Sequence, residues 1–111
     1  MLTNPRPDGR NFRAAVGIYG RCHDLPRSRA IGIPLMQLAG ELDRNHVDAC
    51  RAAGPPIEVH ILPGAYHSWD DMQASGKLTS YGDTMLYDYA STERSKELVR
   101  TFLTRQFAAA R

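Results

Sequence analysis

Residues 62–70 constrain the fold of this chain more than any other stretch. They follow directly on residues 57–62, a run with the length and composition of a β-strand. Pro63 and Gly64 end that run with a turn, and His67 comes immediately after the turn. The chain therefore has to place a histidine just beyond the end of a strand.

A second unit of the same design lies upstream. Residues 33–39 have the pattern of another strand, with Pro34 near its start, where the missing N–H does least harm. Gly40 opens the turn that follows, and this turn presents Asp43. Because functional sites in open parallel sheets form at the carboxyl ends of the strands, we expect Asp43 and His67 to lie close together.

Three further runs complete the predicted elements. Residues 12–19 form a short apolar run closed by Gly20, which predicts a strand covered on both faces. Residues 45–53 are helical in pattern. Residues 93–109 carry an apolar stripe at helical spacing, with Thr92 as the expected N-cap and Glu93 in the first turn. Residues 1–11 and 21–32 are predicted loops, and residues 68–89 a long surface excursion with only short structure.

Strands followed by helices in this order indicate an α/β fold with a parallel sheet. Three such strands leave two unpaired edges, and the run 12–19 is as apolar as a central strand. We therefore predict the C-terminal part of a doubly wound parallel sheet, about three strands plus a C-terminal helix, forming a single partial domain over residues 1–111. Self-association, or pairing with an N-terminal half, is expected through the exposed strand edge.

Charge and hydropathy exclude several classes of function. The net charge is +2, and the positive residues form no dense Lys/Arg run, so we expect no nucleic-acid partner. The apolar runs are too short to span a membrane, and the polar N-terminus lacks the apolar core of a signal peptide. These features predict a cytoplasmic location, or a periplasmic or secreted one if a longer parent protein carries a signal peptide.

The two cysteines, Cys22 and Cys50, are too few for a disulfide framework or a zinc site. Free thiols in a cytoplasmic protein are the expectation that we favour. A disulfide between Cys22 and Cys50 is the other interpretation, and it requires that the parent protein is exported.

An acid after one strand and a histidine after the next form the orienting half of an Asp–His–nucleophile relay. Asp43 would accept a hydrogen bond from one ring nitrogen of His67 and so fix the tautomer of the imidazole. The other ring nitrogen would take the proton of a nucleophile. Each residue also has a plainer interpretation, Asp43 as a loop or helix-capping carboxylate and His67 as a hydrogen-bonded structural histidine.

Two aromatic residues are candidates for substrate contact. Trp69 would line a pocket and Tyr19 would lend its hydroxyl near the site, with core packing and structural hydrogen bonding as the respective alternatives. His23, His46 and His60 lack metal-ligand spacing with one another, so we expect no metal site. No cofactor is expected either, because the relay uses protein groups only.

Three segments carry a family resemblance: residues 12–20, residues 34–43 with Gly-Glu-x-Asp ending at Asp43, and residues 63–69 with Gly-x-x-His-x-aromatic around His67. They resemble the C-terminal half of the dienelactone hydrolase family of α/β-hydrolases, and the final helix fits that family's closing helix. The resemblance covers nearly the whole chain from Phe12 onward. It implies that Asp43 is the triad acid, that His67 is the triad histidine, and that a small-molecule ester or lactone is cleaved through a cysteine or serine.

The chain departs from the family in lacking the nucleophile elbow, Gly-x-Cys/Ser-x-Gly. In the family this elbow lies one strand unit before the segment that begins at Phe12, so we expect the nucleophile outside this chain. A non-catalytic fragment, or an interaction piece that docks on a separate N-terminal half, is the alternative.

Cys22 is a possible substitute nucleophile, because Cys22, Asp43 and His67 keep the chain order of the triad. However, Asp24 stands where the elbow has its second glycine, and Pro26 follows. No helix would begin there to lower the pKa of the thiol, so we do not favour this assignment.

Overall fold

The computed structural model describes residues 14–19, 22, 33–53, 57–80 and 82–109 of the 111-residue chain. Within these residues, strands β1 (Ala15–Ile18), β2 (Leu35–Gly40) and β3 (Glu58–Leu62) form one sheet in the order β1-β2-β3. Both strand pairs are parallel. The predicted parallel α/β arrangement is therefore confirmed for this part of the chain, although β1 is shorter than predicted.

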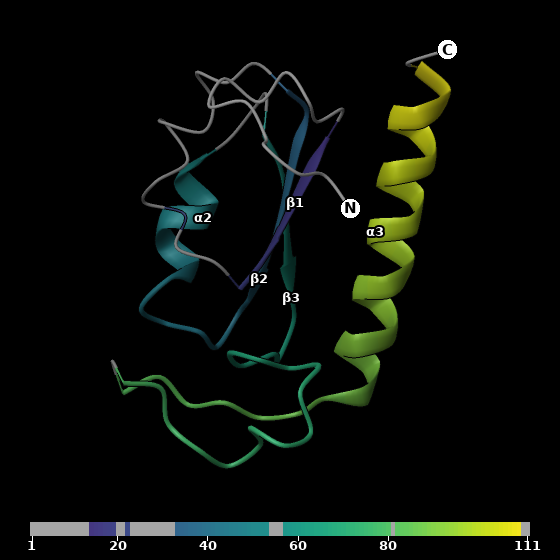
Figure 1. Ribbon diagram of the computed structural model, residues 1–111. Coiled ribbons are helices and arrows are strands. Elements are labelled where there is room, and N and C mark those ends of the chain that lie inside the picture. The colour runs from purple at the N-terminus through teal and green to yellow at the C-terminus, as the bar shows by residue number, and fades with distance from the viewer. Residues whose placement is uncertain (1–13, 20–21, 23–32, 54–56, 81, 110–111) are drawn as a thin grey trace, which may run out of the picture.

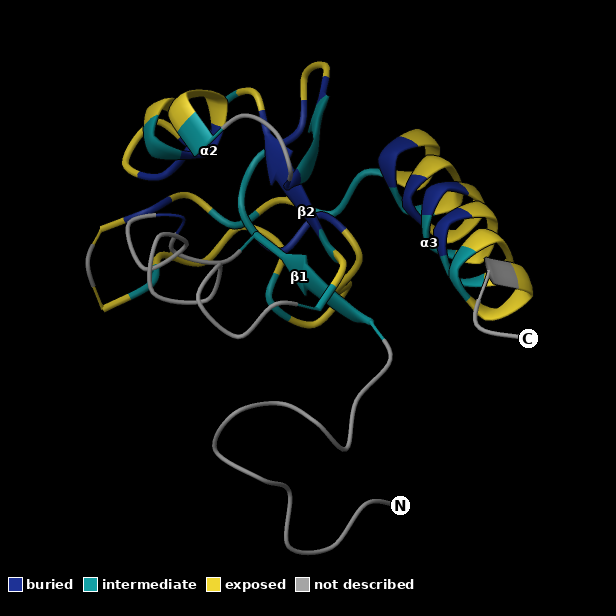
Figure 2. Cartoon of the chain, turned by 90° about the horizontal axis from the view of Figure 1, so that it is seen from above, coloured by how far each residue is buried: buried dark blue, intermediate teal, exposed yellow. Residues whose placement is uncertain are grey.

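Two helices cover the two faces of the sheet (Figures 1 and 2). Helix α2 (Val47–Ala53) follows β2, and helix α3 (Tyr89–Ala109) closes the chain. In Figure 2 the buried stripe of α3 faces the sheet and its exposed stripe faces away. No helix in the described part of the chain is long and apolar enough to cross a membrane.

The central strand β2 explains why the sheet is apolar on both sides. Its side chains alternate, so that Met36 and Leu38 pack toward α3 while Ala39 packs toward α2. All three are almost fully buried. The α3-side cluster contains Met36, Leu38, Leu62, Ala65, Trp69, Leu98 and Phe102, and the α2-side cluster contains Cys22, Ala39, Val47, Cys50 and Ile57.

Helix α3 begins earlier than the sequence indicated. Its first residue is Tyr89, and Asp88 is the cap, since Asp88 Oδ2 accepts a hydrogen bond from the backbone N–H of Ser91 at 2.9 Å. The prediction of Thr92 as N-cap is therefore wrong, and Glu93 lies beyond the first turn. The Thr92 hydroxyl instead donates to the carbonyl of Asp88 at 2.8 Å, inside the helix.

The segment between β3 and α3 crosses beneath the carboxyl ends of the strands (Figure 1). Its described residues contain only isolated bridges, His67 with Met85 and Leu78 with Thr84, in agreement with the predicted excursion. Its return path runs beside its start, because the N–H of Leu86 donates to the carbonyl of His67 at 3.2 Å. The segment therefore covers the edge of the sheet where Asp43 lies.

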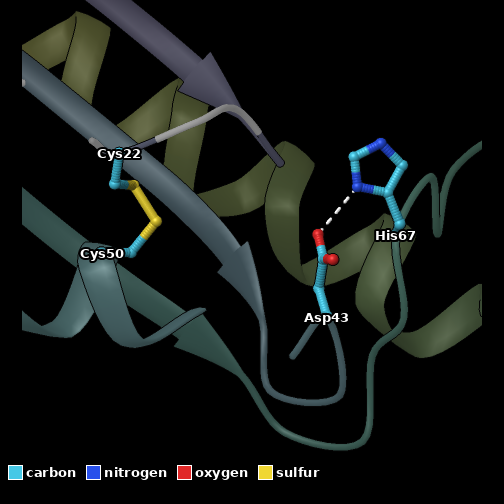
Figure 3. The surroundings of a disulfide bond; sticks show 4 residues. All are labelled: Cys22, Asp43, Cys50 and His67. Carbon is cyan, nitrogen blue, oxygen red and sulfur yellow. Dashed lines mark hydrogen bonds and ion pairs between the residues drawn. A yellow bond between two sulfur atoms is a disulfide. The ribbon is translucent and has the colours of Figure 1, made fainter. Parts of the chain in front are cut away.

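The cysteines are where the structure departs most from our expectation. Cys22 and Cys50 form a disulfide with Cα atoms 4.9 Å apart, and the chain has no free cysteine. The prediction of free thiols is therefore wrong. The bond ties the chain after β1 to helix α2 (Figure 3). The predicted loop at 1–11, the predicted loop at 21–32 apart from Cys22, and Gly20 at the end of the first predicted strand lie outside the described residues.

Candidate active site

Asp43 is held by the turn between β2 and α2. Its own N–H donates to the carbonyl of Gly40 at 3.1 Å, and its carbonyl accepts the N–H groups of His46 and Val47 at 3.0 and 2.9 Å. The turn therefore leads directly into the helix, which fixes the direction of the Asp43 side chain. Its carboxylate is only 1% exposed.

Gly40 allows the turn after β3 to approach the turn after β2. A Cβ atom at this position would lie 2.5 Å from the backbone oxygen of Ala65, closer than any real contact. Two further hydrogen bonds join the turns: the N–H of Leu42 donates to the carbonyl of Ala65 at 2.8 Å, and the N–H of Gly64 donates to Glu41 Oε1 at 2.8 Å. The glycine of the Gly-Glu-x-Asp motif is thus a packing requirement.

Asp43 and His67 meet across these two turns, as their positions after neighbouring strands predict. His67 Nδ1 lies 2.7 Å from Asp43 Oδ2 (Figure 3). The His67 side chain is 16% exposed, so its outer edge is open while its inner edge faces the buried carboxylate. Bonds from the His67 backbone to residues 84 and 86 hold the residue in place.

A second Asp–His pair lies beside the first, and the sequence analysis missed it. His46 Nε2 lies 3.0 Å from Asp83 Oδ2, and both side chains are at least nine-tenths buried. Asp83 also accepts hydrogen bonds from Asn45 Nδ2 and from Thr79 Oγ1. Burial of Asp83 acts to raise its pKa, but the hydrogen bonds from Asn45 and His46 outweigh that effect and hold the pKa below its ordinary value.

The two pairs form one cluster. One possible ligand atom from each of Asp43, His46, His67 and Asp83 lies within 4.8 Å of all the others. The two imidazole rings are 5.6 Å apart between centroids. The sequence did not indicate His46 as a metal ligand, because it has no partner histidine at metal-ligand spacing. In the structure its neighbours in the cluster include two carboxylates. The spacing of Asp43 and His46 was a usable signal, whereas nothing in the sequence ties Asp83 to either.

Tyr19 lies next to His67, as its assignment to the site requires. The two ring centroids are 4.8 Å apart. The Tyr19 hydroxyl donates to Asp70 Oδ1 at 3.2 Å, so it is already engaged. Burial of the ring, together with the negative charge of Asp70, raises the pKa of Tyr19 above its ordinary value, and the hydroxyl is therefore a neutral donor at neutral pH.

Trp69 packs in the core and does not line an open pocket. Its side chain is fully buried in the α3-side cluster, and its indole N–H donates to Ser95 Oγ at 2.9 Å. The core-packing alternative therefore describes Trp69, and a substrate contact with its ring has no open path in this arrangement. Its ring still contributes to the site indirectly, because it lies 5.1 Å edge-on from the Tyr19 ring.

Two hollows open near the strand ends. A cavity of about 270 Å³ is bordered by both carboxylates of the cluster, Asp43 and Asp83, together with Leu42, Tyr66 and Thr84. A larger groove of about 610 Å³ lies between the end of β1 and α3 and is bordered by Ile18, Met72, Tyr87 and Val99. Of these two hollows in the described part of the chain, the smaller one borders the Asp–His cluster.

The described residues offer no activated nucleophile to this cluster. The disulfide removes the Cys22 thiol that the chain order of Cys22, Asp43 and His67 suggested. Comparison of the chain with protein-family models, with curated proteins and with solved structures finds no match. The chemistry is therefore inferred from the geometry of the site: an imidazole oriented by a buried carboxylate can accept and return a proton.

Proposed function

We propose that this chain supplies the acid–base half of a hydrolase of carboxylic esters or lactones, similar to the dienelactone hydrolase family. The observation that carries the proposal is the 2.7 Å contact between His67 Nδ1 and the buried Asp43 carboxylate. The resemblance of residues 34–43 and 63–69 to the family's motifs supports the same assignment. In this proposal the three strands are the C-terminal part of an α/β-hydrolase sheet.

In the proposed mechanism Asp43 accepts the Nδ1–H of His67, which leaves the lone pair of Nε2 free. That nitrogen takes the proton of a cysteine or serine as its sulfur or oxygen attacks the ester carbonyl. Asp43 stabilises the imidazolium that results. His67 then returns the proton to the leaving alkoxide, and the same base activates water to release the acyl group.

We place the nucleophile, and the amides that bind the oxyanion, on a segment outside these 111 residues. Strand β1 supports this placement, since within the described residues it pairs only with β2 and its other edge is open to a further parallel strand. A strand added there would end at the same sheet edge as Asp43 and His67.

The disulfide bears on the compartment in which the proposal should be tested. Disulfides persist in oxidising surroundings and are rare where thiols are kept reduced. The bond between Cys22 and Cys50 therefore favours a periplasmic or secreted parent protein over the cytoplasmic location that we first expected.

The test is hydrolysis of a nitrophenyl ester and of a simple lactone by this chain, co-expressed with the upstream coding sequence that carries Gly-x-Cys/Ser-x-Gly. We expect repeated turnover, and we expect His67→Ala to lower kcat/KM by about 10²- to 10⁴-fold, the usual contribution of a general base. His60→Ala is the matched control. His60 is also bonded to a carboxylate, Glu58 at 2.7 Å, but it lies within β3 rather than at its carboxyl end.

Each outcome decides a separate part of the proposal. The hydrolase assignment fails if no upstream coding sequence carries the elbow, or if the hydrolysis rate does not depend on His67. The alternative, a non-catalytic interaction piece, is then favoured. If the 111-residue chain alone hydrolyses the ester and this activity depends on His67, the hydrolase assignment stands but the placement of the nucleophile outside the chain is wrong. If His60→Ala is as damaging as His67→Ala, the loss reflects folding.

A further inference from the structure

Two histidines in the cluster are arranged so that each has one ring nitrogen bonded to an aspartate and another that is not. His67 uses Nδ1 for Asp43, and His46 uses Nε2 for Asp83. His46 Nδ1 is buried and has no hydrogen-bond partner among the described residues. A carboxylate that fixes one ring nitrogen and leaves the other free is the arrangement by which proteins prepare histidine to bind a metal.

The charges at the cluster point the same way. Asp43 and Asp83 bring two buried carboxylates to within 4.8 Å of each other. Like charges at this distance in a poorly solvated site repel strongly unless a positive charge lies between them. In addition, Asp43 Oδ1 is buried and accepts no hydrogen bond from any residue that the structure describes. Such an orphaned oxygen is costly unless a cation or a proton donor satisfies it.

We propose that Asp43, His46, His67 and Asp83 bind one divalent transition-metal ion, with Zn²⁺ as the best fit. Two imidazole nitrogens and two carboxylate oxygens form a four-donor set of the kind that Zn²⁺ binds. Ca²⁺ and Mg²⁺ prefer sites made entirely of oxygen, so the two histidines select against them. The disulfide leaves no thiolate elsewhere in the chain to compete for the metal.

A metal ion has a path to this cluster. The cavity of about 270 Å³ is bordered by Asp43 and Asp83, so it lies against two of the four proposed ligands. The His67 side chain is 16% exposed and forms a second partly open side. An entry path of this kind is one of the requirements for a metal site.

The metal site stands without the proposed function, but the two together predict inhibition. Zn²⁺ and a nucleophile's proton would compete for the lone pairs of the same imidazole. Zn²⁺ should therefore inhibit ester hydrolysis, and a chelator should restore it. This expectation rests on the proposed function. Binding by the chain itself is measured without any substrate, so failure of one proposal is distinguishable from failure of the other.

The test is titration of ZnCl₂ into the purified, oxidised chain at neutral pH, followed by calorimetry and by ¹H–¹⁵N NMR of the histidine rings. We expect one Zn²⁺ per chain, with ring shifts at His46 and His67 and none at His60. An excess of Mg²⁺ or Ca²⁺ should leave the titration unchanged. This measurement needs no variant, so it holds even if a substitution prevents folding.

Variants assign the ligands. His46→Ala and Asp83→Asn should each weaken Zn²⁺ binding by at least about 10-fold, whereas His60→Ala should leave it unchanged. The proposal is overturned if the chain shows no saturable Zn²⁺ binding, or if the ring shifts fall on His60 or His23. It is also overturned if His46 and His67 are imidazolium ions at neutral pH and ignore Zn²⁺, because protons then supply the missing positive charge.

Discussion

The two Asp–His pairs of the cluster are made of the same residue types but are supported very differently. Asp83 accepts hydrogen bonds from three side chains, those of Asn45, His46 and Thr79. Asp43 accepts a side-chain hydrogen bond only from His67 within the described residues, and its second oxygen has no donor. His46 is buried, whereas His67 keeps an open edge.

We call the Asp83–His46 pair locked, because several partners hold it, and the Asp43–His67 pair poised, because its two members depend mainly on each other. A carboxylate with three donors is stabilised as an anion, and its position does not depend on any one of them. A buried carboxylate with one donor depends on its histidine, and the histidine depends on it in turn. Of the two pairs, the Asp43–His67 pair has the partly exposed imidazole that proton transfer to a substrate requires. The contrast therefore assigns the acid–base chemistry to that pair and leaves the His46–Asp83 pair to support the cluster and to bind the proposed metal.

The largest effect should come from replacing the two aspartates in the ester assay described above. Asp43→Asn should lower kcat/KM by about 10³-fold, because the amide cannot hold the Nδ1–H tautomer of His67. Asp83→Asn should lower it by less than about 10-fold, since the Asp83 carboxylate is hydrogen-bonded to Asn45, His46 and Thr79 and not to His67. Equal losses in the two variants would mean that the pairs act as one unit and would break the contrast.

For stability we expect the order to be reversed. Asp83→Ala leaves three donors without their acceptor, including the buried His46, and should lower the free energy of unfolding by about 2–3 kcal/mol. Asp43→Ala loses one bond to a partly exposed ring and should cost about 1 kcal/mol. Urea denaturation of the oxidised chains measures both values. A larger loss for Asp43→Ala would show that the poised pair also holds the turns together.

The smallest predicted effect is on the pH dependence of stability. The pKa of Asp83 is lower in the folded chain than its ordinary value, so the unfolded chain binds the proton more readily. The stabilisation from Asp83 is therefore complete above the ordinary aspartate pKa and is lost as the pH falls through the folded value. The gap in urea midpoint between the wild type and Asp83→Ala should be constant near neutral pH and narrow in acid. A gap that widens in acid contradicts this assignment.

The sheet was predictable because its signals are local. The runs that became β2 and β3 have the length and composition of strands, and Gly40 and Pro63-Gly64 mark their ends. The start of α3 was not predictable in the same way. From the sequence we named only Thr92 as the cap, but Asp88, four residues earlier, is also of a residue type that caps helices. Asp88 is selected by its contact with Ser91 and by the bond from its N–H to the carbonyl of Trp69 at 2.8 Å.

Half of the cluster followed from the sequence, since Asp43 and His67 come after neighbouring strands. The other half did not, because Asp83 reaches the site through a segment without regular pattern. Its position is set by the bridge between Leu78 and Thr84 and by the bond between the Asp83 backbone and the Thr79 hydroxyl, both of which are tertiary features. The same limit applies to the cysteines, whose pairing depends on how the end of β1 meets α2.

The disulfide also determines what a protease could release from this chain. Cys22 precedes β2, and Cys50 follows Asp43, so the bond encloses both the central strand and the acid of the site. A single cut between the cysteines, for example after Arg27 or Arg29, would yield two polypeptides that stay covalently linked. On a gel such a nicked protein migrates as one species until reductant is added, because the disulfide keeps the fragment with β1 attached to the fragment with His67.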